Sequence, residues 1–159
     1  MTGGARRGLT DGEKAFVRTA FGDRIDLDRV RIRHGAGANP AAAIALRLAD
    51  AVTMIDTIHF RDPPPDDFSQ SGARLLFLHE MTHVWQYQTL GAVRFYWRYL
   101  RDWTKCRFDR HAMYAYEPGE PFHAAMLEAQ AEMVRDYGGG GGGKVKACRC
   151  LAGTGLYEL

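Results

Sequence analysis

The most constraining feature of this sequence is a long central segment without helix breakers. From Ala73 to Leu90 there is no glycine and no proline, Ser71 can cap the amino end, and Gly91 can end the segment. Its large apolar side chains cover most of the circumference of a helix: Leu75, Leu76, Leu78, Met81, Val84 and Trp85. The sequence therefore predicts a central, buried helix around which the rest of the chain must pack.

This helix carries the pattern HExxH at residues 79–83. Residues four apart lie one turn apart on the same face of a helix, so the imidazoles of His79 and His83 can converge on one zinc ion at about 2.0–2.1 Å each. Glu80 projects beside the metal, where its carboxylate can take a proton from a zinc-bound water. The pattern predicts a zinc centre with His79 and His83 as ligands and Glu80 as the catalytic general base.

A catalytic zinc needs a third protein ligand and one open position. Gln86 and Thr89 stand where the glycine and the third histidine of the longer pattern HExxHxxGxxH would be, so the third ligand must lie downstream. Glu128 and Glu132 are four residues apart in a predicted helix and face the same way. We assign Glu128 as the third metal ligand and Glu132 as the acceptor of a hydrogen bond from a ligand imidazole.

Two further histidines, His111 and His123, are rivals for the third position, and each lies near a predicted loop. Hydrolysis also needs a donor for the oxygen that becomes negatively charged in the transition state. Tyr114, Tyr116 and the same two histidines are candidates, because all four precede the ligand-bearing helix. The sequence does not select among them.

Outside the central helix, the chain alternates predicted helices with short strands. Further helices are expected at residues 9–21, 39–49, 93–105 and 122–137. A strand exposed on one face is expected around Val30 and Ile32, and residues 52–60 are interpreted as two short strands joined by a tight turn. Three consecutive prolines exclude regular structure in the loop that follows. This pattern predicts an α+β fold.

Composition limits the class of protein further. The 159 residues suffice for one domain, and 21 Lys+Arg against 19 Asp+Glu give a formal charge of +2, too small a surplus to favour nucleic acid as a partner. No apolar run is long enough to span a bilayer, so we expect no membrane partner. Because residues 1–14 lack a secretory pattern and the three cysteines lack framework spacing, we expect a cytoplasmic location or delivery by a non-classical secretion system.

Three stretches of the sequence resemble a bacterial group of zincin-type metallopeptidase domains, found in Vgr-related proteins and beside extracellular contractile injection systems. The stretches are DLDRVRIRHG with the Ala-rich segment after it, TIHFRD leading to LLFLHEMTHVWQYQ, and YAYEPGEPFHAAMLEAQAEMVRDY. The resemblance implies a compact zincin-like core, in which a small mixed or antiparallel sheet packs on the central HExxH helix and a ligand-bearing helix follows. It implies the same ligands, His79, His83 and Glu128, and the same base, Glu80.

The resemblance also implies that the strand near Ile58 and Phe60 flanks the cleft, so that a peptide could add to its edge. It ends at Tyr137, after which come six glycines and a segment with Cys148 and Cys150. We therefore expect a zincin-like metallopeptidase domain at residues 1–137 and a Gly-rich linker with a flexible tail at residues 138–159.

The residues and the resemblance together predict a zinc-dependent peptidase that cleaves a peptide or protein substrate with zinc-activated water. The resemblance also links it to a bacterial secretion or injection apparatus, whose proteins are expected partners. The alternative is a non-enzymatic accessory or binding module of a secretion system that retains a structural zinc site. A third reading is an effector that acts inside a target cell.

Overall fold

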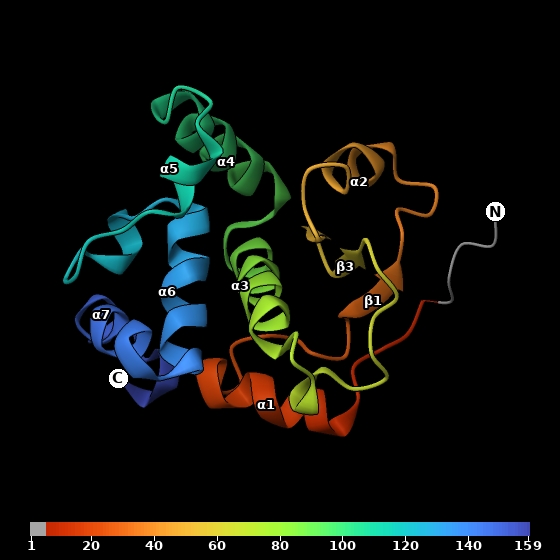
Figure 1. Cartoon of the computed structure of the whole chain (residues 1–159), viewed down its shortest axis with the longest axis horizontal. Coiled ribbons are helices and arrows are strands. Elements are labelled where there is room, and N and C mark those ends of the chain that lie inside the picture. The colour runs from red at the N-terminus through yellow and green to blue at the C-terminus, as the bar shows by residue number, and fades with distance from the viewer. Residues whose placement is uncertain (1–5) are drawn as a thin grey trace.

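The computed structural model describes residues 6–159, which fold as a helix-rich α+β structure (Figure 1). The helices are α1 (Asp11–Phe21), α2 (Pro40–Ala45), α3 (Arg74–Leu90), α4 (Ala92–Lys105), α5 (Arg110–Tyr114), α6 (Leu127–Gly139) and α7 (Gly141–Leu151). The strands are β1 (Arg31–His34), β2 (Ala51–Met54) and β3 (Thr57–Phe60). Short 3-10 turns lie at Phe68–Gln70, Phe122–Ala124 and Leu156–Glu158. The predicted α+β class is confirmed, and none of these helices is both long and apolar enough to cross a bilayer.

The three strands form a mixed sheet in the order β1-β3-β2. β1 runs parallel to β3, with Ile32 opposite Ile58, and β2 runs antiparallel to β3, with Thr53 opposite Ile58. β2 and β3 are the two strands with a tight turn that the sequence predicts at residues 52–60. The expectation that the strand near Ile58 and Phe60 offers an edge is wrong, because that strand is the middle one. The outer strands are β1, which forms a bridge with Arg7 through Ile32, and β2, whose partner among residues 6–159 is β3.

Helix α3 forms the centre of the core. It lies between the sheet and α6 (Figure 1), and every residue from Phe77 to Val84 is buried. The helix ends at Gly91, whose φ of 78° is easily reached by glycine, as predicted. Its amino end differs from the prediction: Ala73 is the cap residue, and the hydroxyl of Ser71 accepts a hydrogen bond from the Ala73 backbone amide instead (3.1 Å).

One buried carboxylate ties the amino-terminal region to the proline-rich loop. Thr10 and Glu13 form a capping box at the start of α1. The fully buried Glu13 also accepts two hydrogen bonds from the Arg7 guanidinium, both 2.8 Å, and one from the backbone amide of Phe68 (3.0 Å). Phe68 in turn stacks on Phe77 of α3, with ring centroids 4.8 Å apart. The loop that leads into α3 is therefore anchored although it has little regular structure.

Helix α4 leaves several large apolar side chains exposed to solvent. Its buried residues are Phe95 and Asp102, and Asp102 accepts a hydrogen bond from the backbone amide of Leu127 at the start of α6 (3.0 Å). Trp97 is 70% exposed and Leu100 is 50% exposed. Much of the apolar side of this helix therefore faces outward, while an aspartate joins it to α6.

The residues after Tyr137 belong to the core. Only Gly140, with φ 77°, separates α6 from α7, and a Cβ at Gly143 would lie 3.1 Å from the backbone oxygen of Asp136, so glycine permits the close packing of the two helices. The face of α7 that packs inward contains Ala147, Cys150 and Leu151. The expectation of a linker and flexible tail over residues 138–159 is therefore wrong.

Leu151→Ala is expected to lower the free energy of unfolding by about 2–5 kcal/mol, because it removes a fully buried side chain from the packing of α7. Val145→Ala, on the same helix but 78% exposed, is expected to change it by less than about 0.5 kcal/mol. Urea unfolding followed by circular dichroism measures both. Equally small effects from the two substitutions would show that α7 does not contribute to the cooperative core.

Candidate metal centre

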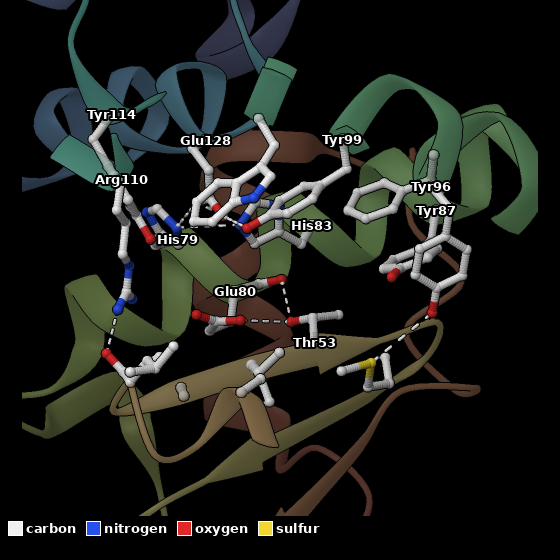
Figure 2. A pocket seen from close by; sticks show the side chains of 18 residues that line it. Thr53, His79, Glu80, His83, Tyr87, Tyr96, Tyr99, Arg110, Tyr114 and Glu128 are labelled. Atoms are coloured by element: carbon white, nitrogen blue, oxygen red, sulfur yellow. Dashed lines mark hydrogen bonds and ion pairs between the residues drawn. The ribbon is translucent and has the colours of Figure 1, made fainter. Parts of the chain in front are cut away.

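Helices α3 and α6 bring three ligand atoms together (Figure 2). Glu128 Oε2 lies 3.0 Å from His79 Nε2 and 3.1 Å from His83 Nε2, and the two Nε2 atoms are 3.2 Å apart. All three residues are at most 6% exposed. Within residues 6–159, these three side chains make up the group that could hold a metal ion.

The spacing of these atoms fits a tetrahedral ion. Ligand atoms at about 2.0–2.1 Å from a zinc ion, at tetrahedral angles, lie roughly 3.3 Å from one another. The observed separations of 3.0, 3.1 and 3.2 Å are close to that value. Two imidazole nitrogens and one carboxylate oxygen are also the donor set of known catalytic zinc sites. These side chains therefore fit a divalent transition metal with three protein ligands.

A relay of side-chain amides fixes the ring of His83. Gln130 Nε2 donates to two backbone carbonyls (2.9 and 3.2 Å), so its Oε1 is left to accept a hydrogen bond from Gln86 Nε2 (3.0 Å). Gln86 Nε2 also donates to the Leu127 carbonyl (2.9 Å), and its Oε1 lies 2.8 Å from His83 Nδ1. His83 Nδ1 must therefore be the donor to Gln86, which leaves Nε2 with its lone pair toward the metal position.

His79 is held on two sides. Its Nδ1 lies 2.9 Å from Glu132 Oε1, within ion-pair distance although the carboxylate is off the line of the N–H bond. Its ring stacks on Tyr114 of α5, with centroids 5.8 Å apart. A carboxylate beside Nδ1 favours a proton on that nitrogen, which again turns the lone pair of Nε2 toward Glu128 and the metal position.

The negative charge of Glu128 and the positive charge of a protonated imidazole stabilise each other. Burial disfavours the charge of Glu128, but the imidazoles of His83 and His79 outweigh it and hold the pKa of this carboxyl well below its usual range. Burial also opposes protonation of His79, but the neighbouring carboxylates of Glu128 and Glu132 outweigh it and raise its pKa to about 10. A metal that binds here must displace protons from the imidazoles, so its affinity rises with pH.

Glu80 faces the edge strand of the sheet. Its Oε2 accepts a hydrogen bond from the Thr53 hydroxyl (2.7 Å), which also contacts the backbone oxygen of Glu80 (3.1 Å). Glu80 is outside the ligand group but lines the same cavity as His79 and His83 (Figure 2). Its carboxylate is thus held next to the metal position by a neighbour that is not a ligand.

A cavity of about 230 Å³ reaches the three ligand side chains and Glu80. Residues of β2, α3 and α4 line most of it, and Arg110 and Tyr114 of α5 line one end. A second hollow of about 350 Å³ meets the centre from another direction, and Arg110 and Tyr114 line that one too. The metal position is therefore open to a cleft and is not sealed in the core.

The other candidate donors and ligands predicted from the sequence lie in different environments. Tyr114 lines the cavity, but the buried Tyr116 donates its hydroxyl to Asp136 (2.6 Å) and lines neither hollow, so its assignment as an oxyanion donor is wrong. The rival ligands are both outside the ligand group. His111 lines only the second hollow, and His123 is exposed on the 3-10 turn before α6.

Four contributors were not predicted: Gln86, its relay partner Gln130, Thr53 and Tyr99. The Tyr99 hydroxyl donates to Glu128 Oε1 (3.0 Å) and so holds the oxygen that does not face the histidines. Gln86 follows His83 by three residues on the same helix, a spacing from which the contact could have been inferred. Thr53 and Tyr99 come from β2 and α4, and no local signal marks either of them.

The sequence and the fold both match known proteins. The chain belongs to the eCIS core domain family, whose profile matches residues 9–91, just over half of the chain. It is also similar to the type VI secretion system spike protein VgrG2b of Pseudomonas aeruginosa (strain PAO1), with 31% identity over 133 residues. That match covers 84% of this chain and 13% of the spike protein.

Among solved structures, the chain is similar to the effector domain of Pseudomonas aeruginosa VgrG2b. The two are 31% identical with a TM-score of 0.70, and the match covers 94% of this chain and 83% of the other. The resemblance to Vgr-related and injection-system-associated proteins is confirmed. The assignment to zincin-type metallopeptidases stays a prediction.

Gln86→Leu is expected to weaken zinc binding by about 10–100-fold, because His83 loses the acceptor that keeps its proton on Nδ1. Gln88→Leu is the matched control on the same helix, since Gln88 bonds to Asp26 and Asp56. Its zinc affinity is expected to stay within about twofold of the wild type, because it touches no ligand. Competition with a chromogenic chelator measures both affinities. A folded Gln86→Leu protein with wild-type zinc affinity would contradict the role of the relay.

Proposed function

We propose that the chain is a zinc-dependent peptidase with a zincin-like core, in which His79, His83 and Glu128 hold the zinc ion and Glu80 is the general base. The observation that carries this proposal is the convergence of three buried ligand atoms, 3.0 to 3.2 Å apart, on the wall of an open cavity. A group of this kind with an adjacent carboxylate is suited to metal-assisted hydrolysis.

The number of ligands supports a catalytic role over a structural one. Structural zinc sites are closed by four protein ligands, whereas catalytic sites have three and leave one position for water or substrate. The part of the chain that the structure describes offers three ligands in one group, and the cavity reaches all of them. A structural zinc site in a binding module would need a fourth protein ligand, and this group contains three.

The chemistry divides between the ion and the chain. A zinc ion supplies a bound water whose pKa is lowered to about 7 and polarises a substrate carbonyl. Glu80 is placed to take the proton of the attacking water and to deliver it to the leaving nitrogen. Thr53, at 2.7 Å from Oε2, holds the Glu80 carboxylate in position, and Tyr99 does the same for Glu128 at 3.0 Å.

Tyr114 is our candidate for the donor to the substrate oxygen. It lines the cavity and stacks on His79. Burial, together with the charge of Glu128, raises the pKa of Tyr114 to about 12, so its hydroxyl keeps its proton at neutral pH and can donate. The guanidinium of Arg110 lies 6.0 Å from the centroid of the Tyr114 ring and donates to the Leu48 carbonyl at the mouth of the cavity.

The relatives support a link to a bacterial secretion apparatus. The curated relative is named as a spike protein, and the solved structure is named as its effector domain. Because this chain matches only 13% of the spike protein, the activities of the remainder do not transfer to it. We propose that this chain is an effector delivered by such an apparatus and that it acts on a peptide or protein substrate.

Glu80→Gln is expected to reduce peptide cleavage by at least ~100-fold, because the amide cannot accept the proton of the attacking water. It should leave one zinc ion bound per chain, since Glu80 is not in the ligand group. Glu117→Gln, an exposed carboxylate that lines neither hollow, serves as the control and should retain full activity. Mass spectrometry of a diverse peptide mixture incubated with zinc-loaded protein measures cleavage, and elemental analysis measures zinc.

The same measurements separate the alternatives. Glu128→Ala should lose both zinc and activity, because it removes one of three ligands. Cleavage by Glu80→Gln at the wild-type rate would refute the proposed base. Stoichiometric zinc with no cleavage of any peptide by the wild type would favour the non-enzymatic module.

A further inference from the structure

We propose that the α4 end of the cavity is a recess that binds a bulky apolar side chain of a peptide lying along β2. This inference rests on the proposed function in one respect, namely that a peptide is what enters the cleft. It adds the substrate class: an extended peptide with an aromatic or large aliphatic residue next to the bond at the metal centre.

The edge of β2 provides the place for the peptide backbone. All four residues of β2 line the cavity, and β3 is the strand that pairs with it among the described residues. Asp50 accepts a backbone hydrogen bond from Arg61, so by antiparallel alternation the backbone groups of Ala51 and Thr53 point to the free edge. An extended chain that pairs with these groups would lie beside Glu80, whose carboxylate is bonded to the Thr53 side chain.

The side chains at one end of this edge are aromatic and apolar. Figure 2 shows Tyr87 and Tyr96 on one side of the histidine pair and Arg110 and Tyr114 on the other, while Tyr99 extends over His83 to Glu128. Met54 contacts Tyr96 at this end, whereas Leu48 accepts a hydrogen bond from Arg110 and so lies at the other end. The two ends therefore differ in chemistry: aromatic rings and Met54 line the α4 end, and the α5 end carries a guanidinium.

The aromatic wall of the recess is packed against the core and is thus preformed. Tyr87 stacks on Phe95 with centroids 3.7 Å apart, and Tyr96 meets both rings edge-on at 5.8 and 5.9 Å. The hydroxyl of Tyr96 points to Met54 Sδ at 3.9 Å, which joins α4 to the end of β2. A wall of this kind loses little conformational freedom when a ligand binds.

The size and exposure of the recess fit one large side chain. The whole cavity, of which the recess is one end, has a volume of about 230 Å³, and an apolar protein cavity of roughly 150 Å³ already binds benzene. At its rim Tyr96 is 49% exposed, so part of this aromatic surface stays in water until something covers it. Covering such surface with an apolar side chain favours binding, whereas a polar side chain would have to lose its water.

The test uses binding, so that it does not depend on turnover. Zinc-loaded Glu80→Gln protein is titrated into three fluorescein-labelled ten-residue peptides of Gly, Ser and Ala whose central residue is Phe, Ser or Asp, and anisotropy is recorded. The Phe peptide is expected to bind at least ~10-fold more tightly than the other two. Equal affinities for the three, including no measurable binding of any, would overturn the proposal.

A matched pair of variants tests whether the Phe side chain enters this cavity. Ala45→Trp, added to the Glu80→Gln protein, places an indole at the α2 wall of the cavity and is expected to weaken binding of the Phe peptide by at least ~10-fold. Ala43→Trp, on the same helix but exposed and outside the cavity, is expected to stay within about twofold, because it leaves the recess open. Equal effects of the two variants would also overturn it.

Failure of this inference and failure of the proposed function are distinguishable. If the wild-type protein cleaves the Ser and Phe peptides at equal rates, the proposed peptidase activity is supported and the proposed apolar recess is refuted. If the wild-type protein binds the Phe peptide preferentially but cleaves none of the three peptides, the recess is supported and the proposed peptidase activity is contradicted.

Discussion

The contact of Glu128 with both imidazoles of α3 is the interaction on which the rest of the site depends. One carboxylate oxygen lies 3.0 and 3.1 Å from the two Nε2 atoms, and all three residues are at most 6% exposed. Two ring nitrogens 3.2 Å apart and a carboxylate are costly to bury unless a proton or a cation lies between them. The packing of α6 on α3 therefore holds together groups that favour a positively charged ion.

Much of the surrounding polar structure serves to hold these groups. The amides of Gln130 and Gln86 orient His83, Tyr99 binds the second oxygen of Glu128, and Asp102 of α4 binds the first backbone amide of α6. Each partner is itself buried or packed, so the geometry is set before any ligand arrives. A buried polar network of this kind also explains why a helix as central as α3 can carry so many polar residues.

Several features of the fold and the centre could be predicted from the sequence. HExxH on a segment without glycine or proline places His79 and His83 on one face of a buried helix, and the EAQAE stretch places two carboxylates on one face of another. Other predictions were wrong. Polyglycine is typical of flexible segments and predicts a linker, yet here the absence of side chains lets α7 approach α6 closely. Tyr116, like Tyr114, precedes the ligand-bearing helix and is therefore a predicted donor, but its hydroxyl binds Asp136.

The sequence by itself determined what depends on the helical repeat: which histidines share a face, that Glu80 stands beside them and outside the ligand group, and that Glu128 and Glu132 point together. Only the tertiary structure decided that β2 is the edge strand at the cleft, that Tyr99 and Thr53 hold the two carboxylates, and that the aromatic side chains of α4 face a cavity. The physical reason is that the first set follows from spacing along one helix. The second set follows from contacts between segments far apart in the chain, which no local pattern encodes.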